Sequence, residues 1–168
     1  MVRIDYARAM VKLVPMTEAE FAEYLGTAVE LYAQAHIQAG DCEPADALEL
    51  AQADYAMLLP QGLATPDHFL FSVLDETSGA RVGMVWFEMR ELRAGRSAFI
   101  YDFVIRAEHR GKGYGAQTLA SVDRTVEKMG ATRIGLNVMG HNKVARALYE
   151  KHGYEITGIG MTKRLRPA

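Results

Sequence analysis

A short glycine-rich segment, Arg110-Gly111-Lys112-Gly113-Tyr114-Gly115, constrains this 168-residue chain more than any other stretch. An apolar, strand-like run (99–105) precedes it, and an amphipathic, helix-like run (116–128) follows. Glycines at every second position allow a tight turn and leave no Cβ between backbone N–H groups and a ligand. The start of a helix adds unpaired N–H donors and the positive end of the helix dipole. The sequence therefore predicts a strand, a loop and a helix that together bind a phosphate or pyrophosphate group.

Spacing separates this loop from other nucleotide-binding motifs. A P-loop needs Ser or Thr after Gly-Lys, but Gly113 follows Lys112, and a dinucleotide fingerprint needs G-x-G-x-x-G rather than G-x-G-x-G. The pattern that fits is R-x-x-G-x-G, formed by Arg110, Gly113 and Gly115. It resembles the pyrophosphate loop of the GNAT (GCN5-related N-acetyltransferase) superfamily. The alternative for the loop on its own is a tight strand-to-helix turn that binds no ligand.

Composition narrows the class of protein. The length favours one domain, and 49% hydrophobic with 24% charged residues is ordinary for a globular protein. A net charge of −2 argues against a nucleic-acid-binding surface. The single cysteine, Cys42, excludes an internal disulfide framework and a Cys-rich metal site, and the histidines lack metal-ligand spacing. No apolar run approaches membrane-spanning length, so we expect a cytoplasmic protein with neither a metal nor a membrane partner.

The order of the predicted elements indicates an α/β fold with a mixed sheet. We expect a loose leader over residues 1–10, a strand at 11–14, a helix from the capping box of Thr17 and Glu20 to Gly40, and a second helix from Pro44 to about residue 59. A three-stranded meander (68–74, 81–88 and 97–105) leads into the glycine loop and its helix. A strand (132–138), a helix (142–152) and a last strand pair (155–165) complete the order β-α-α-β-β-β-α-β-α-β, with a final hairpin as an extension.

A second motif runs from Asn142 to Tyr154. It resembles the GNAT segment N-x-x-A-x-x-L-Y-E-K-x-G-F/Y. Ala145, Leu148 and Tyr149 fall on one helical face. Asn142 is at the N-cap position, where its side chain either caps the helix or turns to a ligand.

The two motifs, in this order around a crossover strand, resemble the GNAT superfamily from about residue 99 to residue 154. Segments 12–16, 58–62 and 140–146 further resemble small bacterial acetyltransferases of unassigned substrate. The resemblance implies the GNAT fold and a single N-acetyltransferase domain over residues 1–168. The implied reaction moves the acetyl group of acetyl-CoA directly to a primary amine on a small molecule or peptide. The alternative is a non-catalytic acyl-CoA sensor or scaffold, and a homodimer through the C-terminal strands is compatible with the resemblance.

The resemblance also implies roles for individual residues. The residues expected to bind the cofactor are Phe103, Val104, Ile105, Arg110, Gly111, Lys112, Gly113, Tyr114, Gly115, Ala116, Asn142, Ala145 and Tyr149. Tyr149 is the expected acid that protonates the departing thiolate. Two positions at which many family members carry a glutamate base correspond to Phe99 and Asn137 here. Asp102 is therefore the main candidate base, with Glu88 or a chain of waters as alternatives and a purely structural carboxylate as the competing interpretation.

Overall fold

The computed structural model describes residues 11–40, 42–163 and 165, so the leader predicted for residues 1–10 lies outside the described part. The chain forms two compact units that divide after Asn137, and each is described by itself.

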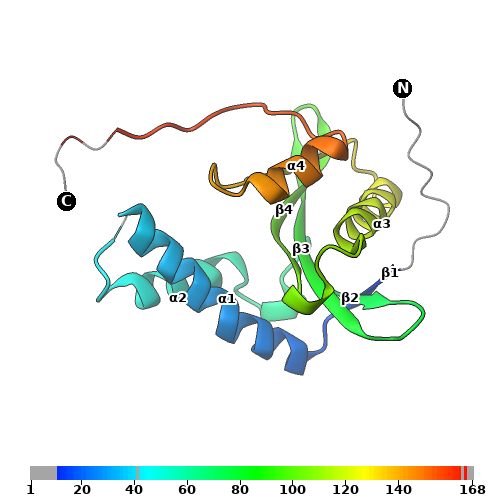
Figure 1. Cartoon of the computed structure of the whole chain (residues 1–168), viewed down its shortest axis with the longest axis horizontal. Coiled ribbons are helices and arrows are strands. Elements are labelled where there is room, and N and C mark those ends of the chain that lie inside the picture. Colours follow the sequence, from blue (N-terminus) through cyan, green and yellow to red (C-terminus); the bar gives the residue numbers. More distant parts are fainter. Residues whose placement is uncertain (1–10, 41, 164, 166–168) are drawn as a thin grey trace. The chain divides into compact units, whose positions relative to one another are not determined.

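The first unit is built on a five-stranded sheet with helices on both faces (Figure 1). The strands are β1 (Val11–Pro15), β2 (His68–Asp75), β3 (Arg81–Leu92), β4 (Gly95–Ile105) and β5 (Arg133–Leu136), in that spatial order. The first four strands are antiparallel to their neighbours, whereas β5 is parallel to β4. The helix α3 (Tyr114–Lys128) makes the crossover between β4 and β5. This confirms the predicted mixed sheet with a single parallel crossover.

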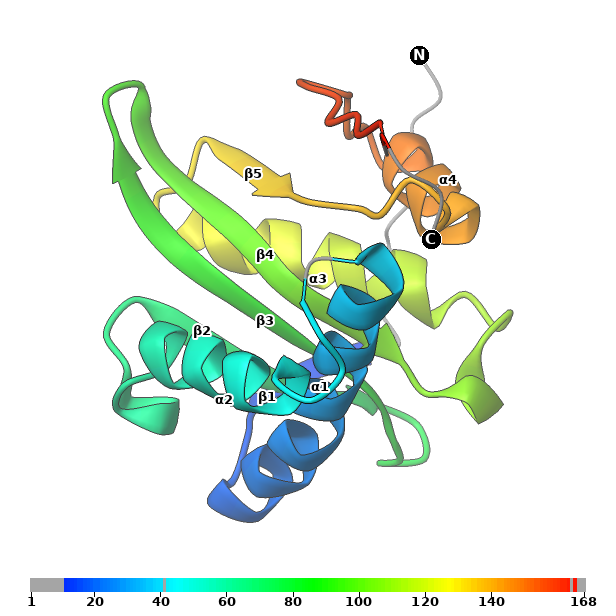
Figure 2. The same ribbon diagram turned by 90° about the vertical axis from the view of Figure 1, so that its left-hand side faces the viewer.

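The helices α1 (Glu18–Ala39) and α2 (Ala47–Leu58) lie on the face of the sheet opposite α3 (Figure 2). The predicted capping box is confirmed, because the N–H of Glu20 donates to Thr17 Oγ1 and the N–H of Thr17 donates to the Glu20 carboxylate. Gly40 ends α1 in the left-handed region, with φ of 76°. The prediction that Pro44 starts the second helix is wrong by three residues. A turn comes first, closed by a bond from the N–H of Asp46 to the carbonyl of Glu43, and α2 begins after it.

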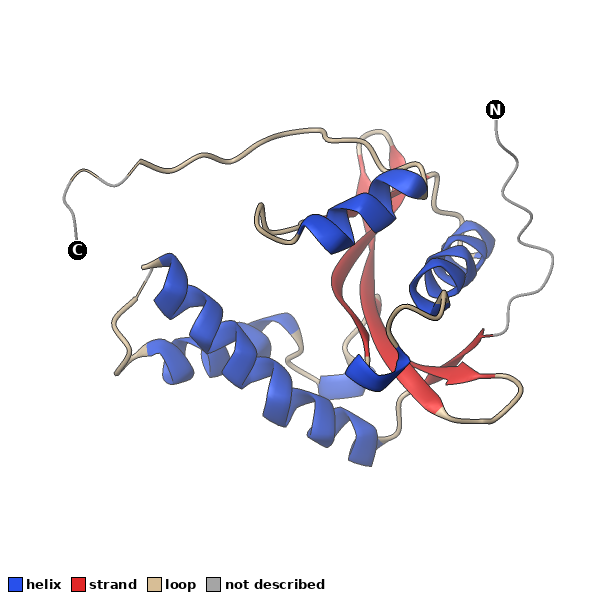
Figure 3. Ribbon diagram, viewed as in Figure 1, coloured by secondary structure: helices blue, strands red, loops and turns tan. Residues whose placement is uncertain are grey.

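The core fills the space between the helices and each face of the sheet. On the α1–α2 side, six buried residues form one cluster: Met16, Phe21, Leu59, Leu70, Met84 and Trp86. On the α3 side, Leu119, Val122 and Val126 are fully buried, as their spacing along the helix requires. Two short 3₁₀ turns, Gly62–Ala64 and Ala107–His109, connect the longer elements (Figure 3).

A β-bulge at Tyr101 changes the direction of side chains along β4. Trp86 of β3 pairs with Asp102, but the next residue, Phe87, pairs with Ile100, so Tyr101 is the extra residue. As a result, two consecutive side chains reach the α1–α2 side of the sheet. The ring of Tyr101 stacks on Trp86, with 4.6 Å between centroids, while Asp102 accepts a hydrogen bond from an α1 side chain.

The second unit contains the helix α4 (Lys143–Lys151), followed by residues 153–163 without helix or strand. The predicted last strand pair over 155–165 is therefore not formed in the described residues. Gly158 and Gly160 give this segment no side chains to pack at those positions, and they weaken a strand that has no regular partner.

Asp75 ties the start of α3 to the turn between β2 and β3. Its carboxylate accepts hydrogen bonds from the hydroxyl of Tyr114 and from the N–H groups of Thr77 and Ser78, the last two at 2.7 and 2.8 Å. These bonds, that of Tyr114 foremost, lower the pKa of Asp75 to about 2. Because Tyr114 belongs to the glycine-rich segment, this contact also positions the loop against the sheet.

This arrangement predicts a specific loss of stability in acid. The pKa of Asp75 is lower in the folded chain than the ordinary value of about 3.9, so its stabilising contribution is complete above about pH 4 and disappears as the pH falls toward 2. Asp75→Asn should remove that part of the pH dependence from urea midpoints measured between pH 5 and pH 2.5. The exposed neighbour Glu76 supplies the control, Glu76→Gln. An unchanged pH slope in Asp75→Asn would contradict this role.

Candidate active site

The part of β4 after the bulge has one edge that β5 does not cover. Pairing between β4 and β5 ends at Ile100 and Leu136, whereas β4 continues to Ile105. On its other side this part of β4 pairs with β3. No other strand in the described residues joins the sheet beyond Ile100 on the β5 side. An extended ligand that carries amide groups would complete such an edge by backbone hydrogen bonds.

Three predicted cofactor-binding residues, Phe103, Val104 and Ile105, lie in this part of β4. The backbone N–H of Phe103 is near the carboxylate of Asp102 and acts to lower its pKa. The side chain of Val104 is exposed to solvent despite its apolar character. The strand edge thus presents backbone groups beside an apolar surface.

The glycine loop places a group of backbone donors at the start of α3. Gly111 and Gly113 have φ angles of 73° and 86°, in the region that favours glycine. A Cβ added at Gly111 would meet open space, so its positive φ rather than close packing explains the glycine. Gly113 is the N-cap of α3 and provides no side-chain cap. The next three N–H groups, those of Tyr114, Gly115 and Ala116, are in the first turn and have no intrahelical acceptor.

The basic side chains of the loop hold it to the end of β4. Arg110 Nε donates to the carbonyl oxygen of Ile105 at 3.0 Å, and Lys112 Nζ donates to the carbonyl oxygen of Glu108 at 2.8 Å. Arg110 therefore joins the strand edge and the N–H cluster into one surface. Both side chains are exposed, so their positive charge remains close to any anion bound at the start of α3.

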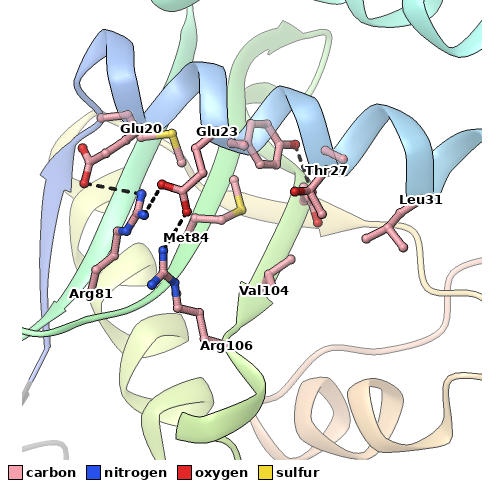
Figure 4. Close-up of a pocket in the computed structure, with 13 residues that line it drawn as sticks. Glu20, Glu23, Thr27, Leu31, Arg81, Met84, Val104 and Arg106 are labelled. Atoms are coloured by element: carbon pink, nitrogen blue, oxygen red, sulfur yellow. Dashed lines mark hydrogen bonds and ion pairs between the residues drawn. The ribbon is translucent and has the colours of Figure 1, made fainter.

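A cavity of about 180 Å³ lies between α1 and the strands β3 and β4. Figure 4 shows the side chains of α1 on one side of it and those of β3 and β4 on the other. Its lining residues are Met16, Glu20, Glu23, Tyr24, Thr27, Ala28, Leu31, Arg81, Gly83, Met84, Asp102, Val104 and Arg106. Asp102 and Val104 belong both to this cavity and to the part of β4 beyond the bulge. The cavity and the strand edge are therefore adjacent.

The carboxylate of Asp102 is held in place by a hydrogen bond, in surroundings that favour its protonated form. Its Oδ2 accepts a hydrogen bond from the hydroxyl of Tyr24 at 2.9 Å. Burial raises the pKa of Asp102, and the hydrogen bonds from Tyr24 and the N–H of Phe103 offset this effect only in part. The raised pKa expected for this carboxylate is thus found, with desolvation as its main cause.

Glu88, the other carboxylate considered from the sequence, is held in a different network. It accepts hydrogen bonds from Arg90 Nε at 2.7 Å and from the hydroxyl of Tyr101 at 2.9 Å. It does not line the cavity. Because Glu88 lies outside the cavity and is tied to Arg90 and Tyr101, the geometry favours Asp102 over Glu88.

The remaining predicted site residues belong to the second unit. Asn142 caps α4, because its Oδ1 accepts a hydrogen bond from the N–H of Ala145 at 3.1 Å. The capping interpretation of Asn142 is therefore confirmed. The half-buried side of α4 is formed by Ala145, Leu148 and Tyr149, as their spacing predicts. The ring of Tyr149 packs near that of Tyr154, with centroids 5.5 Å apart.

Sequence reasoning placed the acceptor among the helices near residues 21–59 and the loop near residues 158–161, but it named no individual side chain of α1. Tyr24 and the apolar residues Met16, Ala28 and Leu31 were not predicted individually as site residues. The one available signal was a tyrosine three positions after Phe21 on the apolar side of the helix, where its hydroxyl needs a partner.

Two further classes of site find no support in the described part of the chain. Within residues 11–40, 42–163 and 165, no group of three or more His, Cys, Asp or Glu side chains is arranged to hold a metal ion. None of the helices in these ranges combines the length and the apolar character needed to cross a bilayer.

Comparison with known proteins identifies the family. The model of the Acetyltransferase (GNAT) family matches residues 28–154. The uncharacterized N-acetyltransferase YycN of Bacillus subtilis (strain 168) is 39% identical over 92% of this chain and 99% of its own length, and YdgE of the same organism is 33% identical over 91% and 97%. The crystal structure of YycN superposes with a TM-score of 0.86 at 38% identity, over 94% of this chain and 99% of that chain. The glycine loop, the uncovered edge of β4 and these relatives together show that the chain belongs to the GNAT family of N-acetyltransferases.

Proposed function

We propose that this N-acetyltransferase moves the acetyl group of acetyl-CoA to a primary amine by direct attack, without a covalent enzyme intermediate. The observation that carries the proposal is the continuous surface formed by the edge of β4 and the donors at the start of α3, joined by Arg110. It has the two parts that coenzyme A requires: a strand edge for an amide-bearing arm and an anion site for a pyrophosphate. The family match spans both compact units, which supports treating residues 1–168 as one domain.

In this proposal, different residues of the first unit bind different parts of the cofactor. Phe103, Val104 and Ile105 bind the pantetheine arm along β4. The backbone from Gly111 to Ala116 binds the pyrophosphate, with Arg110 and Lys112 adding positive charge. Asn142 and Ala145, at the start of α4, complete the cofactor site by analogy with the family motif that they match.

In the proposed reaction, two side chains transfer the protons. The amine nitrogen forms a bond with the acetyl carbon while the carbon–sulfur bond breaks. Asp102 accepts the proton that the amine loses, and the hydroxyl of Tyr149 donates a proton to the coenzyme A thiolate. A backbone N–H near Val104 is suited to stabilise the negative charge that develops on the carbonyl oxygen. Solvent returns the proton from Asp102 to Tyr149, which leaves an N-acetylamine and free thiol.

The competing function is that of a domain that binds acyl-CoA without turnover. The absence of a glutamate at Phe99 and Asn137 favoured that alternative, whereas the half-buried Asp102 beside the edge of β4 favours an enzyme. The two are separated by release of free thiol from acetyl-CoA in the presence of a panel of amines, amino acids and peptides. Amine-dependent release supports the enzyme. Saturable binding of acetyl-CoA without release by any acceptor supports the sensor.

Asp102→Asn tests the proposed base. Asparagine keeps an oxygen that accepts the hydrogen bond from Tyr24, so the fold should survive. We expect kcat to fall about 10²-fold, the usual contribution of a general base. The wild-type rate should decline as the pH falls through the raised pKa of Asp102, because only the ionised carboxylate accepts a proton, and this acidic limb should be missing in the variant. If rate and pH profile persist, Asp102 is structural and a chain of waters carries the proton.

Tyr149→Phe tests the proposed acid. The substitution removes one oxygen and keeps the ring that packs beside Tyr154, so folding should change little. We expect kcat to fall about 10²-fold while affinity for acetyl-CoA stays within about threefold, the pattern of a group that acts in the transition state. Tyr154→Phe on the same unit is the matched control. An unchanged kcat would make Tyr149 a packing residue, and a parallel loss of affinity would make its hydroxyl a binding contact.

A further inference from the structure

The cavity beside Asp102 has walls that are mainly apolar. Met16 and Met84 come from the core cluster, and Ala28 and Leu31 come from the following turns of α1. Val104 adds an apolar side chain from β4 itself. The polar groups within these walls are the carboxylate of Asp102 and the hydroxyls of Tyr24 and Thr27, and the first two are bonded to each other. An occupant therefore meets one negative site within mainly apolar walls.

The remaining charged residues of the cavity neutralise one another. Arg81 pairs with Glu23 and, at 3.6 Å, with Glu20, while Arg106 Nη2 lies 3.0 Å from the carboxylate of Glu23. Figure 4 shows these four side chains grouped near the N-terminal end of α1. Two carboxylates and two guanidinium groups give no net charge. A second charged group on the occupant would have to displace an existing ion pair, which gives little net gain.

The size of the cavity favours a small body against its walls. Its volume of about 180 Å³ corresponds to about six water molecules at the volume of liquid water. It is smaller than the pockets of about 300–1,000 Å³ that hold drug-sized ligands. The cavity fits a short hydrocarbon chain better than a multi-ring molecule.

We infer that the cavity binds the acceptor, and that the acceptor is a primary monoamine with an aliphatic body, its amino group at Asp102 and Tyr24 and its chain against the apolar walls. This inference rests on the proposed function, because Asp102 and Val104 connect the cavity to the strand edge assigned to the cofactor. Tyr24 is a positioning residue, since its hydroxyl fixes the carboxylate that meets the amine.

The test compares kcat/KM for straight-chain alkylamines, α,ω-diamines of the same length and a polycationic aminosugar. For alkylamines, kcat/KM should rise about fourfold per added methylene until the cavity is full, the factor that corresponds to burial of one CH₂ group. Hexylamine should exceed 1,6-diaminohexane by at least tenfold, because the second ammonium gains no free partner.

A matched pair of variants assigns this preference to the cavity. Leu31 lines the cavity and is 60% exposed, so Leu31→Asp should fold normally and place a carboxylate beside the aliphatic chain. It should shift the ratio of kcat/KM between hexylamine and the diamine by at least tenfold toward the diamine. Leu48→Asp is the control, because Leu48 is 47% exposed on α2 and does not line the cavity. That variant should leave the ratio unchanged.

Direct binding separates this inference from the proposed function. Hexylamine binding is measured by calorimetry with coenzyme A present. Binding that Leu31→Asp weakens and Leu48→Asp does not supports the cavity assignment, even if no amine releases thiol and the proposed function fails. Turnover that favours the diamine, the aminosugar or a peptide, or equal effects of the two variants, overturns the inference and leaves the acetyltransferase intact.

Discussion

The proposed site depends on the point at which the parallel strands β4 and β5 stop pairing. β4 and β5 pair over only four residues, and β4 then continues five residues beyond the last pair. Within a protein, a backbone group without a partner costs about 1–3 kcal/mol when it is removed from water. An uncovered strand edge therefore favours a ligand that brings its own amides. The start of α3 follows the same principle, since the fold leaves its first N–H groups without acceptors and a pyrophosphate can satisfy them.

Asp102, the proposed base, is held in an environment that disfavours its charge. The bulge at Tyr101 turns this carboxylate toward α1, where burial disfavours its charge. The hydroxyl of Tyr24 compensates in part, and in the proposed complex an amine would supply a positive partner. Glu20 and Glu23, by contrast, already have positively charged partners in Arg81 and Arg106. For this reason we assign the reacting group to Asp102 and not to the larger charged cluster.

The sequence predicted those parts of the protein whose determinants are local. The strand, loop and helix around the glycine segment, the capping box of Thr17 and the hairpins of the meander each depend on residues close together in the chain, and the structure confirms them. The cavity depends on contacts between distant segments, such as the bond between Tyr24 and Asp102 across 78 positions. The bulge that makes this bond possible has no clear local signal. The last strand pair, predicted across residues 155–165, is not formed in the described residues, because a strand requires a partner as well as a propensity.

The most direct measurement of the central claim is a titration with acetyl-CoA followed by backbone amide hydrogen exchange. The account predicts increased protection at Ile105 on the edge of β4 and at Tyr114, Gly115 and Ala116 at the start of α3. The amides of β1, at the far edge of the sheet, should be unchanged. Protection confined to other parts of the chain, with the edge of β4 and the start of α3 unaffected at saturating acetyl-CoA, would contradict it.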